Sequence, residues 1–355
     1  MPPEVGVREA YLTTLLKPTI DAERCVHGRC PIAQCSACVA ACPLSALALE
    51  DEGLTFDSDI CDGCALCAPA CPEQAIDVGH ASRPMISPPG ATDRAFLACE
   101  LVVDPSEQGA VACLNAVSVV ELARIHNRGV RTLTAARADC ANCIRNNGPT
   151  LSDRLANLSK LTRDRGLASL SLKFLDAADW REQRDDARQV TRRSLFRSAI
   201  GGRQPASQDH ERDDAAADPL GIAAPDLILG AQDRATLATV SPSIDHAACV
   251  ACGACVEVCE HGALRLLGRK TDAARYEIDA THCTGCALCI DSCEPGAITL
   301  LAWGQAHPPS VPLVAGKCRL CSSPFHRVAH PAADTSLCHI CATKSHRQKL
   351  FQVLP

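Results

Sequence analysis

Aromatic residues are scarce in this chain, and long apolar runs are missing from it. Only 3% of its 355 residues are Phe, Trp or Tyr, which disfavours a protein that stacks nucleic-acid bases on aromatic rings. No stretch approaches the roughly 18 consecutive apolar residues of a membrane span. Residues 1–20 carry charges where a secretory signal has an apolar core. The net charge of −6 offers no general attraction for a polyanion. We therefore expect a cytoplasmic protein with no membrane span and no nucleic-acid partner.

Motifs for common catalytic chemistry are missing too. The sequence has no glycine-rich phosphate loop and no dinucleotide-binding fingerprint. No Cys–His pairing stands out as a nucleophile with its base. We expect no catalytic residues and a protein that is not an enzyme by itself.

Cysteine, in contrast, is abundant. There are 25 cysteines, an odd number, and most stand in C-x-x-C groups. A disulfide scaffold is usually a short secreted chain with an even count. A long chain with an odd count indicates reduced thiols that bind metal.

One cysteine motif is repeated along the chain. Three copies, beginning at Cys61, Cys249 and Cys283, have the spacing C-x2-C-x2-C-x3-C. Each follows an Ile-Asp or Phe-Asp pair and precedes an Ala-Ile or Ala-Leu pair. In bacterial ferredoxins this spacing lets three cysteines bind one [4Fe–4S] cluster while the fourth binds its neighbour. Zinc ribbons need two C-x-x-C pairs per ion rather than four cysteines in one run, so the repeat predicts iron–sulfur clusters.

The first copy departs from this spacing. Its last cysteine is Cys42, but Ile32 stands where its first cysteine is expected. Cys25 and Cys30 are the two remaining candidates. The pair Ile20-Asp21 stands before Cys25 at the same distance at which an Ile-Asp or Phe-Asp pair stands before the first cysteine of each other copy. We therefore favour Cys25 as the ligand, and expect Cys30 to be spare or a near neighbour of the cluster.

Residues 20–79 and 244–302 resemble bacterial dicluster [4Fe–4S] ferredoxins; we call them the first and second modules. The resemblance implies that each module has a pair of short antiparallel hairpins and two short helices around two clusters. It also implies four sets of ligands, each named here after one member. They are the Cys25 set (Cys25, Cys35, Cys38 and Cys71), the Cys61 set (Cys61, Cys64, Cys67 and Cys42), the Cys249 set (Cys249, Cys252, Cys255 and Cys293) and the Cys283 set (Cys283, Cys286, Cys289 and Cys259).

The two modules differ in the residue that follows the last cysteine of each motif copy. Glu260 and Glu294 stand where the first module has Pro43 and Pro72. A carboxylate beside a ligand disfavours an added electron and lowers the potential. Our hypothesis is that the second module is the more reducing one.

Between the modules, apolar runs alternate with stretches of helical period. We expect strands at 95–98, 110–112, 130–133 and 167–175 and helices at 117–125 and 151–161, which predicts a small α/β domain with a largely parallel sheet.

Four cysteines follow its strands, where the carboxyl edge of a parallel sheet forms ligand sites. This middle set is Cys99, Cys113, Cys140 and Cys143. The hypothesis is a further metal centre, either a fifth iron–sulfur cluster or zinc. The alternative is that Cys99 and Cys113 are buried core residues.

Residues 177–242 are dense in charge and predict a solvated helix followed by a flexible linker. Within them, residues 192–196 (RRSLF) resemble a twin-arginine signal, but they lie mid-chain and no apolar segment follows. The two remaining interpretations are a docking element for a partner and a plain exposed helix.

The end of the chain has another cysteine pattern. Two C-x-x-C pairs are separated by 16 residues, which predicts a zinc ribbon with four thiolates. This tail set is Cys318, Cys321, Cys338 and Cys341. A single iron with the same ligands is the alternative, and the need of so short a segment for a metal staple favours structural zinc.

The expected fold class is α+β. Two dicluster modules (1–80 and 243–303) flank the α/β domain (91–176) and its linker (177–242), and a zinc-ribbon-like tail follows (312–355). The expected function is to relay single electrons through about four [4Fe–4S] clusters to or from a larger oxidoreductase. The resemblance implies a partner of the molybdenum or tungsten, flavin or hydrogenase type. The alternatives are an accessory protein that matures a metalloenzyme and, less favoured, a catalytic middle domain.

Overall fold

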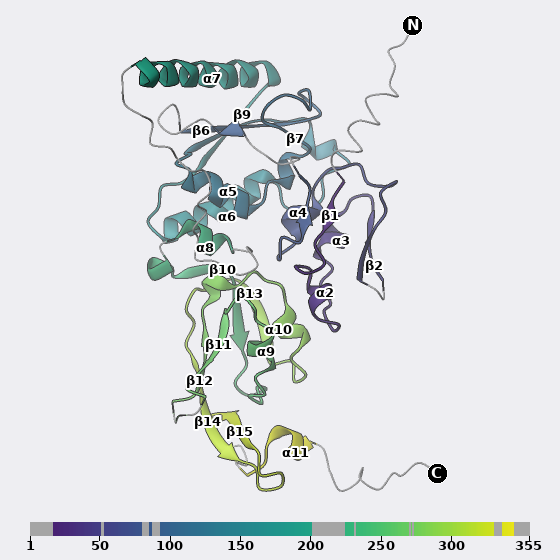
Figure 1. The fold of residues 1–355 in the computed structure, drawn as a ribbon, viewed down its shortest axis with the longest axis vertical. Coiled ribbons are helices and arrows are strands. Elements are labelled where there is room, and N and C mark those ends of the chain that lie inside the picture. Colours follow the sequence, from purple (N-terminus) through teal and green to yellow (C-terminus); the bar gives the residue numbers. More distant parts are fainter. Residues whose placement is uncertain are drawn as a thin grey trace. The chain divides into compact units, whose positions relative to one another are not determined.

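The computed structural model describes residues 17–50, 53–79, 85–86, 93–200, 224–230, 232–269, 271, 273–329 and 336–343, with backbone alone at 189–200 and 232. The chain forms two compact units, Met1–Ala235 and Thr236–Pro355, each a mixture of helices and small sheets (Figure 1). Among the described residues, no helix is both long and apolar enough to cross a membrane. Four short 3-10 helices, η1 to η4, are Leu114–Ala116, Cys140–Asn142, Gln232–Arg234 and Ala280–His282.

The first module contains two antiparallel strand pairs. Strand β1 (Thr19–Ile20) pairs with β4 (Ile76–Asp77), and β2 (Leu47–Glu50) pairs with β3 (Gly53–Phe56). The pair β2–β3 is a hairpin, but β1 and β4 are the two ends of the module. The expectation of two hairpins is therefore wrong here, because the outer strands of the repeat close on each other. The short helices are α2 (Val26–Arg29), α3 (Ala37–Ala41) and α4 (Cys67–Ala70).

The second module repeats this plan with longer outer strands. Strand β10 (Leu237–Ile244) pairs with β13 (Ile298–Gln305), and β11 (Leu264–Leu267) pairs with β12 (Arg275–Ile278). Its helices are α9 (Ala254–Glu257) and α10 (Leu288–Asp291). Since β10 begins at Leu237, the linker expected to reach residue 242 ends earlier. Ala238 and Ser241 are buried, which is why this part of the chain is a strand.

The tail continues the sheet of the second module. Strands β14 (Val311–Lys317) and β15 (Pro324–Val328) form a hairpin, and β14 pairs with β12, so the strand order is β11-β12-β14-β15. Val311, Leu313 and Val328 pack in the same apolar core as Tyr276. Helix α11 (His339–Thr343) follows. The tail hairpin and the module therefore share one core.

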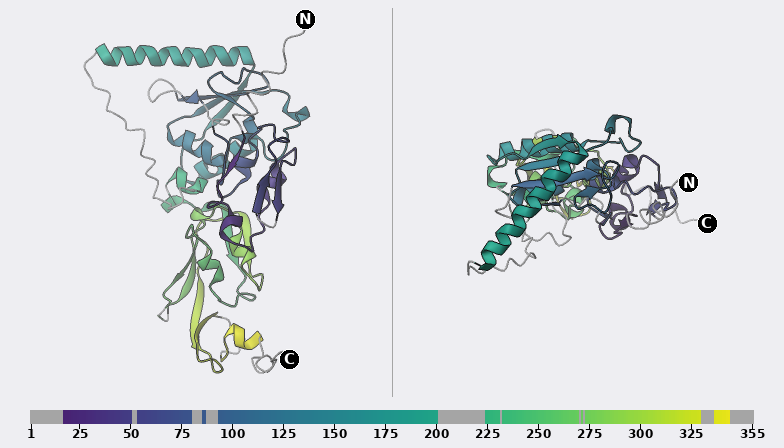
Figure 2. Two further views of the ribbon diagram at one scale, coloured as in Figure 1. Left: turned by 45° about the vertical axis from the view of Figure 1, so that its right-hand side comes forward. Right: turned by 90° about the horizontal axis from the view of Figure 1, so that it is seen from above.

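The middle domain is a sheet covered by helices on both faces (Figure 2). Its strands are β5 (Met85–Ile86), β6 (Arg94–Cys99), β7 (Ala110–Val111), β8 (Thr132–Ala136) and β9 (Ser171–Leu175). The order is β5-β6-β8-β9 with β7 also beside β6, and every pairing except β5–β6 is parallel. Strand β8 continues through the fully buried Thr134, past the run expected at 130–133.

Two helices with well-defined starts cover one face of this sheet. They are α5 (Val119–Asn127) and α6 (Leu151–Asp164). Ser118 caps α5 by accepting the N–H of Glu121, and Thr150 forms a capping box with Asp153 at α6. Their positions follow the predicted periodicity, and α6 extends one turn beyond it.

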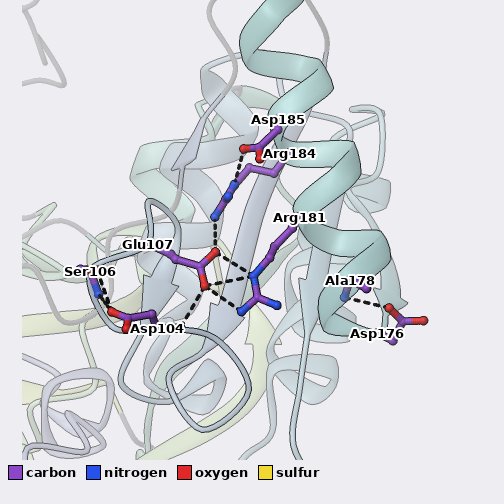
Figure 3. Close-up of polar contacts among 8 residues, drawn as sticks. All are labelled: Asp104, Ser106, Glu107, Asp176, Ala178, Arg181, Arg184 and Asp185. Carbon is purple, nitrogen blue, oxygen red and sulfur yellow. Dashed lines mark hydrogen bonds and ion pairs between the residues drawn. The ribbon is translucent and has the colours of Figure 1, made fainter.

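Helix α7 (Ala177–Ile200) covers the other face, as Figures 1 and 2 show. Its first turns are solvated on one face only, whereas the charge density predicted a solvated helix. Trp180 is fully buried in the core, and Arg184 stacks 4.8 Å from its ring centroid. Arg181 Nη2 and Arg184 Nη1 bind Glu107 at 2.8 and 2.9 Å (Figure 3). The side chains of residues 192–196, where the docking element was expected, lie outside the described residues.

Helix α8 (Pro225–Leu229) packs against α5. Asp226 and Arg165 are both fully buried and pair at 2.7 Å, and Asn127 donates to the carbonyl of Ile228. The flexible linker expected over this segment is therefore wrong for α8, because a buried ion pair holds it on the middle domain.

Candidate metal centres

The loop that carries the first three cysteines winds in the same way in the three regular copies. The residues on both sides of the second cysteine have positive φ, between 54° and 85°. They are Gly63 and Ala65, Ala251 and Gly253, and Gly285 and Ala287. Three of these six are alanines, which rarely adopt this conformation. The loop thereby turns its three thiols toward one hollow.

The fourth cysteine of every copy begins a tight turn. The residue three positions later has positive φ and its N–H donates to the cysteine carbonyl; these residues are Ser45, Gln74, Gly262 and Gly296. In three copies the next N–H donates to the sulfur: Ala46 to Cys42 and Ala75 to Cys71 at 3.3 Å, and Ala297 to Cys293 at 3.2 Å. Such bonds favour the thiolate and tune a bound cluster. The alanine at this position is buried in all four copies, which suits a small side chain.

The aspartate before each motif joins the two copies of a module. Its N–H donates at 2.8–2.9 Å to the alanine carbonyl of the sister copy, as in Asp21 to Ala75 and Asp245 to Ala297. Its carboxylate accepts an N–H two residues on, at 2.8–3.2 Å in the four copies. In the irregular copy the N–H of Cys25 donates to the carbonyl of Asp21 at 3.0 Å, as Cys249 does to Asp245 at 2.9 Å. Cys25 thus occupies the position of a regular first cysteine.

The structure brings each of the four predicted sets together around one hollow. The Cys25, Cys61, Cys249 and Cys283 sets line hollows of about 370, 380, 320 and 340 Å³, volumes that include space open to solvent. Each hollow receives three cysteines from one copy and the fourth from its sister. Cys30, which the structure describes, does not line the hollow of the Cys25 set.

Several buried thiols in these hollows resist ionisation. Burial raises the pKa of Cys38 to about 11 and of Cys64 and Cys67 to about 12, and neighbouring cysteines raise those of Cys38 and Cys67 further. Burial likewise raises the pKa of Cys255 to about 12. Four crowded thiolates need a cation to be stable, and a bound metal supplies it while displacing the protons. This donor set fits a thiolate-ligated metal centre.

The residues inserted after Cys25 contribute contacts that sequence reasoning missed. His27 Nε2 donates to the carbonyl of Cys35 at 2.7 Å. Arg29 forms an ion pair with Glu73, whose side chain is 1% exposed and lines the hollow of the Cys25 set. Arg29 of the irregular copy therefore neutralises a carboxylate of the sister copy beside this site. Nothing in the sequence pairs residues 29 and 73.

The middle set also surrounds one hollow, of about 350 Å³ including open space. Cys99 ends β6, Cys113 follows β7, and the other two cysteines follow β8, so all four lie at the carboxyl edge of the sheet. Burial raises the pKa of Cys99, and raises that of Cys113 to about 11. The volume is within the range of the four module hollows.

The tail set is more compact. All four sulfurs lie within 4.8 Å of one another, and those of Cys321 and Cys338 are 3.8 Å apart. Two thiolates at about 2.3 Å from a tetrahedral ion are about 3.8 Å apart. In the described part of the chain, no other group of three or more His, Cys, Asp or Glu is this close. The tail therefore fits a single ion, whereas the other five sets are spaced more widely.

Backbone hydrogen bonds from Cys321 and Cys338 lower the pKa of Cys318 to about 6. Burial raises the pKa of Cys341 to about 12. Hydrogen bonds with Ser323 also lower the pKa of Cys321. The tail set thus contains two thiols that ionise more readily than an ordinary cysteine and one whose proton a bound cation would displace.

Comparison with known proteins identifies the family. A 4Fe-4S dicluster domain family matches residues 248–297, and a 4Fe-4S binding domain family matches residues 54–76. The pyruvate synthase subunit PorD of Thermotoga maritima is 33% identical over 78 residues, which are 21% of this chain and 71% of that protein. No solved structure matches the chain significantly. Both family matches fall on the cysteine repeats, and the chain belongs to the bacterial 4Fe–4S ferredoxin-type proteins.

Proposed function

We propose that this chain transfers single electrons through four [4Fe–4S] clusters, one in each hollow of the two modules. The observation that carries the proposal is the exchange of cysteines within each module. Every hollow takes three cysteines from one copy of the motif and one from its sister. This exchange is the ligand pattern of paired ferredoxin clusters.

The residues around each hollow suit this role. The cysteines supply the ligands, and main-chain N–H groups donate to the sulfurs of Cys42, Cys71 and Cys293. Apolar neighbours such as Ile76 and Ile298 are buried in the module cores, which limits access of water. Clusters held in this way supply one-electron chemistry at potentials set by charge, hydrogen bonds and exposure.

A larger oxidoreductase is the proposed partner. The relative from Thermotoga maritima is named as a subunit of pyruvate synthase. By analogy, this chain serves as the electron-transfer subunit of a redox enzyme, for which the molybdenum or tungsten, flavin, hydrogenase and 2-oxoacid-oxidising types are the classes to test. We further propose a structural zinc ion in the tail set, because its sulfur spacing matches a tetrahedral ion.

Metal analysis of the full chain, purified without oxygen, tests the proposal. About 16 iron and 16 acid-labile sulfide per chain, with about one zinc, are expected for four clusters and the tail ion. An additional two or four iron would come from a cluster in the middle set. Iron below about 12 together with several zinc ions would contradict the proposal.

Affinity purification separates a permanent subunit from a maturation factor. A subunit stays bound in constant ratio to active enzyme, whereas a maturation factor is found with the inactive precursor and leaves the mature enzyme. Recovery of the chain with the precursor alone would favour the accessory role.

A further inference from the structure

Arg145 lies between two cysteine sites of the first unit. Its Nε donates to Asp62 Oδ2 at 2.7 Å, and its Nη2 to the Asp62 carbonyl at 3.2 Å. Its Nη1 donates to Glu100 Oε1 at 2.6 Å and to the Ala112 carbonyl at 2.9 Å. One guanidinium therefore holds three separate segments of the chain.

Each segment carries cysteines of one of the two sites. Asp62 lies in the loop between Cys61 and Cys64 and lines the hollow of the Cys61 set. Glu100 follows Cys99 and Ala112 precedes Cys113, and Arg145 itself lines the hollow of the middle set. The guanidinium thus contacts the walls of both hollows.

The two hollows also share an apolar wall. Ala112 and Cys113 belong to the same buried core group as Cys64 and Leu66 of the first module. Near this wall, Asn147 Nδ2 donates to the carbonyl of Ala40 at 3.1 Å. The middle set and the Cys61 set are therefore in direct protein contact.

Arg145 keeps its charge in this position. Its side chain is 12% exposed. An arginine guanidinium stays protonated at any ordinary pH, and here it pairs with Asp62 and Glu100. Its hydrogen bonds reach the cysteine-bearing loops of both sites, so its charge acts on both.

The middle set resembles the four module sets more closely than it resembles the tail set. Its hollow of about 350 Å³ falls between the smallest and largest module hollows, about 320 and 380 Å³. Unlike the tail sulfurs, its sulfurs do not form one of the close groups found among the described residues. An iron–sulfur cluster fits this arrangement better than zinc.

We propose that Arg145 joins the middle set and the Cys61 set into one redox pair, because its single positive charge acts on both sites and sets their potentials together. This inference rests on the proposed function, which places a cluster in the hollow of the Cys61 set. When one electron leaves one site and enters the other, no bond is made or broken and Arg145 keeps its proton. The positive charge favours the reduced form at both sites.

Redox titration of the full chain, followed by electron paramagnetic resonance, tests this inference. The variants are Arg145→Gln, Arg145→Lys and the control Arg124→Gln, which removes an exposed arginine on α5 that pairs with Glu121 at 3.7 Å. Iron and sulfide are measured first in each protein. In Arg145→Gln, two centres are expected to shift together to lower potential, by about tenfold in the reduced-to-oxidised ratio or about 59 mV. Arg145→Lys should shift them less, and Arg124→Gln not at all.

Three results would overturn the inference. The first is Arg145→Gln with full iron and a shift in one centre or in none, which leaves the proposed function intact. The second is an unchanged iron content in the double variant Cys140→Ser/Cys143→Ser, which would show that the middle set holds no cluster while the module clusters remain. If Arg145→Gln loses iron, the variant Arg145→Lys decides the question. Full iron in Arg145→Lys with both potentials shifted together supports the inference. Full iron with only one potential shifted is the third contrary result.

Discussion

Cys30 lies in the segment inserted after Cys25, and the structure places these two cysteines differently. The turn at Asp21 directs Cys25 to the hollow, and Cys30 does not line it. We expect Cys25→Ser to lose up to about four iron per chain and Cys30→Ser to keep its full content. Iron analysis of the two variants side by side checks this, and equal iron loss in both would show that the turn does not select the ligand.

Arg29 and Glu73 illustrate how a single ion pair depends on its setting. Glu73 is almost fully buried, so its carboxylate has exchanged water for the Arg29 guanidinium. Arg29→Gln removes the positive charge that pairs with this buried carboxylate, and we expect a loss of about 3 kcal/mol in stability. The thermal midpoint should fall, and the double variant Arg29→Gln/Glu73→Gln should recover much of the loss. A midpoint unchanged in the single variant would mean that the pair contributes no stability.

At the scale of elements, α7 is held to the sheet by Trp180 and by Glu107. Hydrogen bonds from Arg181 are the main cause that lowers the pKa of Glu107 from 4.5 to about 2. Because the folded pKa is the lower one, the stabilisation from this carboxylate is complete above pH 4.5 and is lost as pH falls toward 2. The protection factors of residues 177–187, which correct hydrogen exchange for its slower intrinsic rate in acid, should therefore fall across this window.

The variant Glu107→Gln isolates this effect. It should raise hydrogen exchange in the first turns of α7 at neutral pH and should make that exchange less dependent on pH below 4.5. Glu121→Gln, at an exposed pair on α5, is the matched control. If both variants behave like the wild type, the apolar contact of Trp180 alone holds the helix.

Helix α8 depends on a buried ion pair rather than on its length. It has five residues, too few to be stable alone. Asp226→Asn leaves Arg165 buried with one fewer partner, and we expect it to destabilise the first unit by about 3–5 kcal/mol. Denaturant unfolding measures the change. Replacement of both residues by apolar ones of similar volume should restore most of the stability.

At the scale of the whole molecule, the two modules are expected to differ in potential. Glu260 and Glu294 are exposed, so water screens them and weakens their effect on the neighbouring ligands. A redox titration should still reduce the second-module clusters last. The double variant Glu260→Gln/Glu294→Gln should raise their potentials by less than about 59 mV, which is less than a tenfold change in the reduced-to-oxidised ratio. Clusters of the second module that are reduced first would contradict the hypothesis.

The sequence by itself determined the groups of cysteines and the order of the modules. Three cysteines of each regular set lie within seven residues, so one loop must carry them and spacing is sufficient to identify them. The aspartate before each motif is also a local signal, and it indicated Cys25. The parallel sheet of the middle domain followed from periodicity, although β8 was misplaced because Thr134 interrupts the apolar run.

Only the tertiary structure decided the features that depend on contacts between distant residues and on the exclusion of water. Arg145 meets Asp62 and Glu100 across 83 and 45 residues, and no local pattern connects them. The buried faces of α7 and α8 were hidden because their charged residues form ion pairs with the middle domain, whereas composition alone counts those residues as solvated. Charge pairing between distant residues depends on the folded geometry, while cysteine spacing within one loop does not.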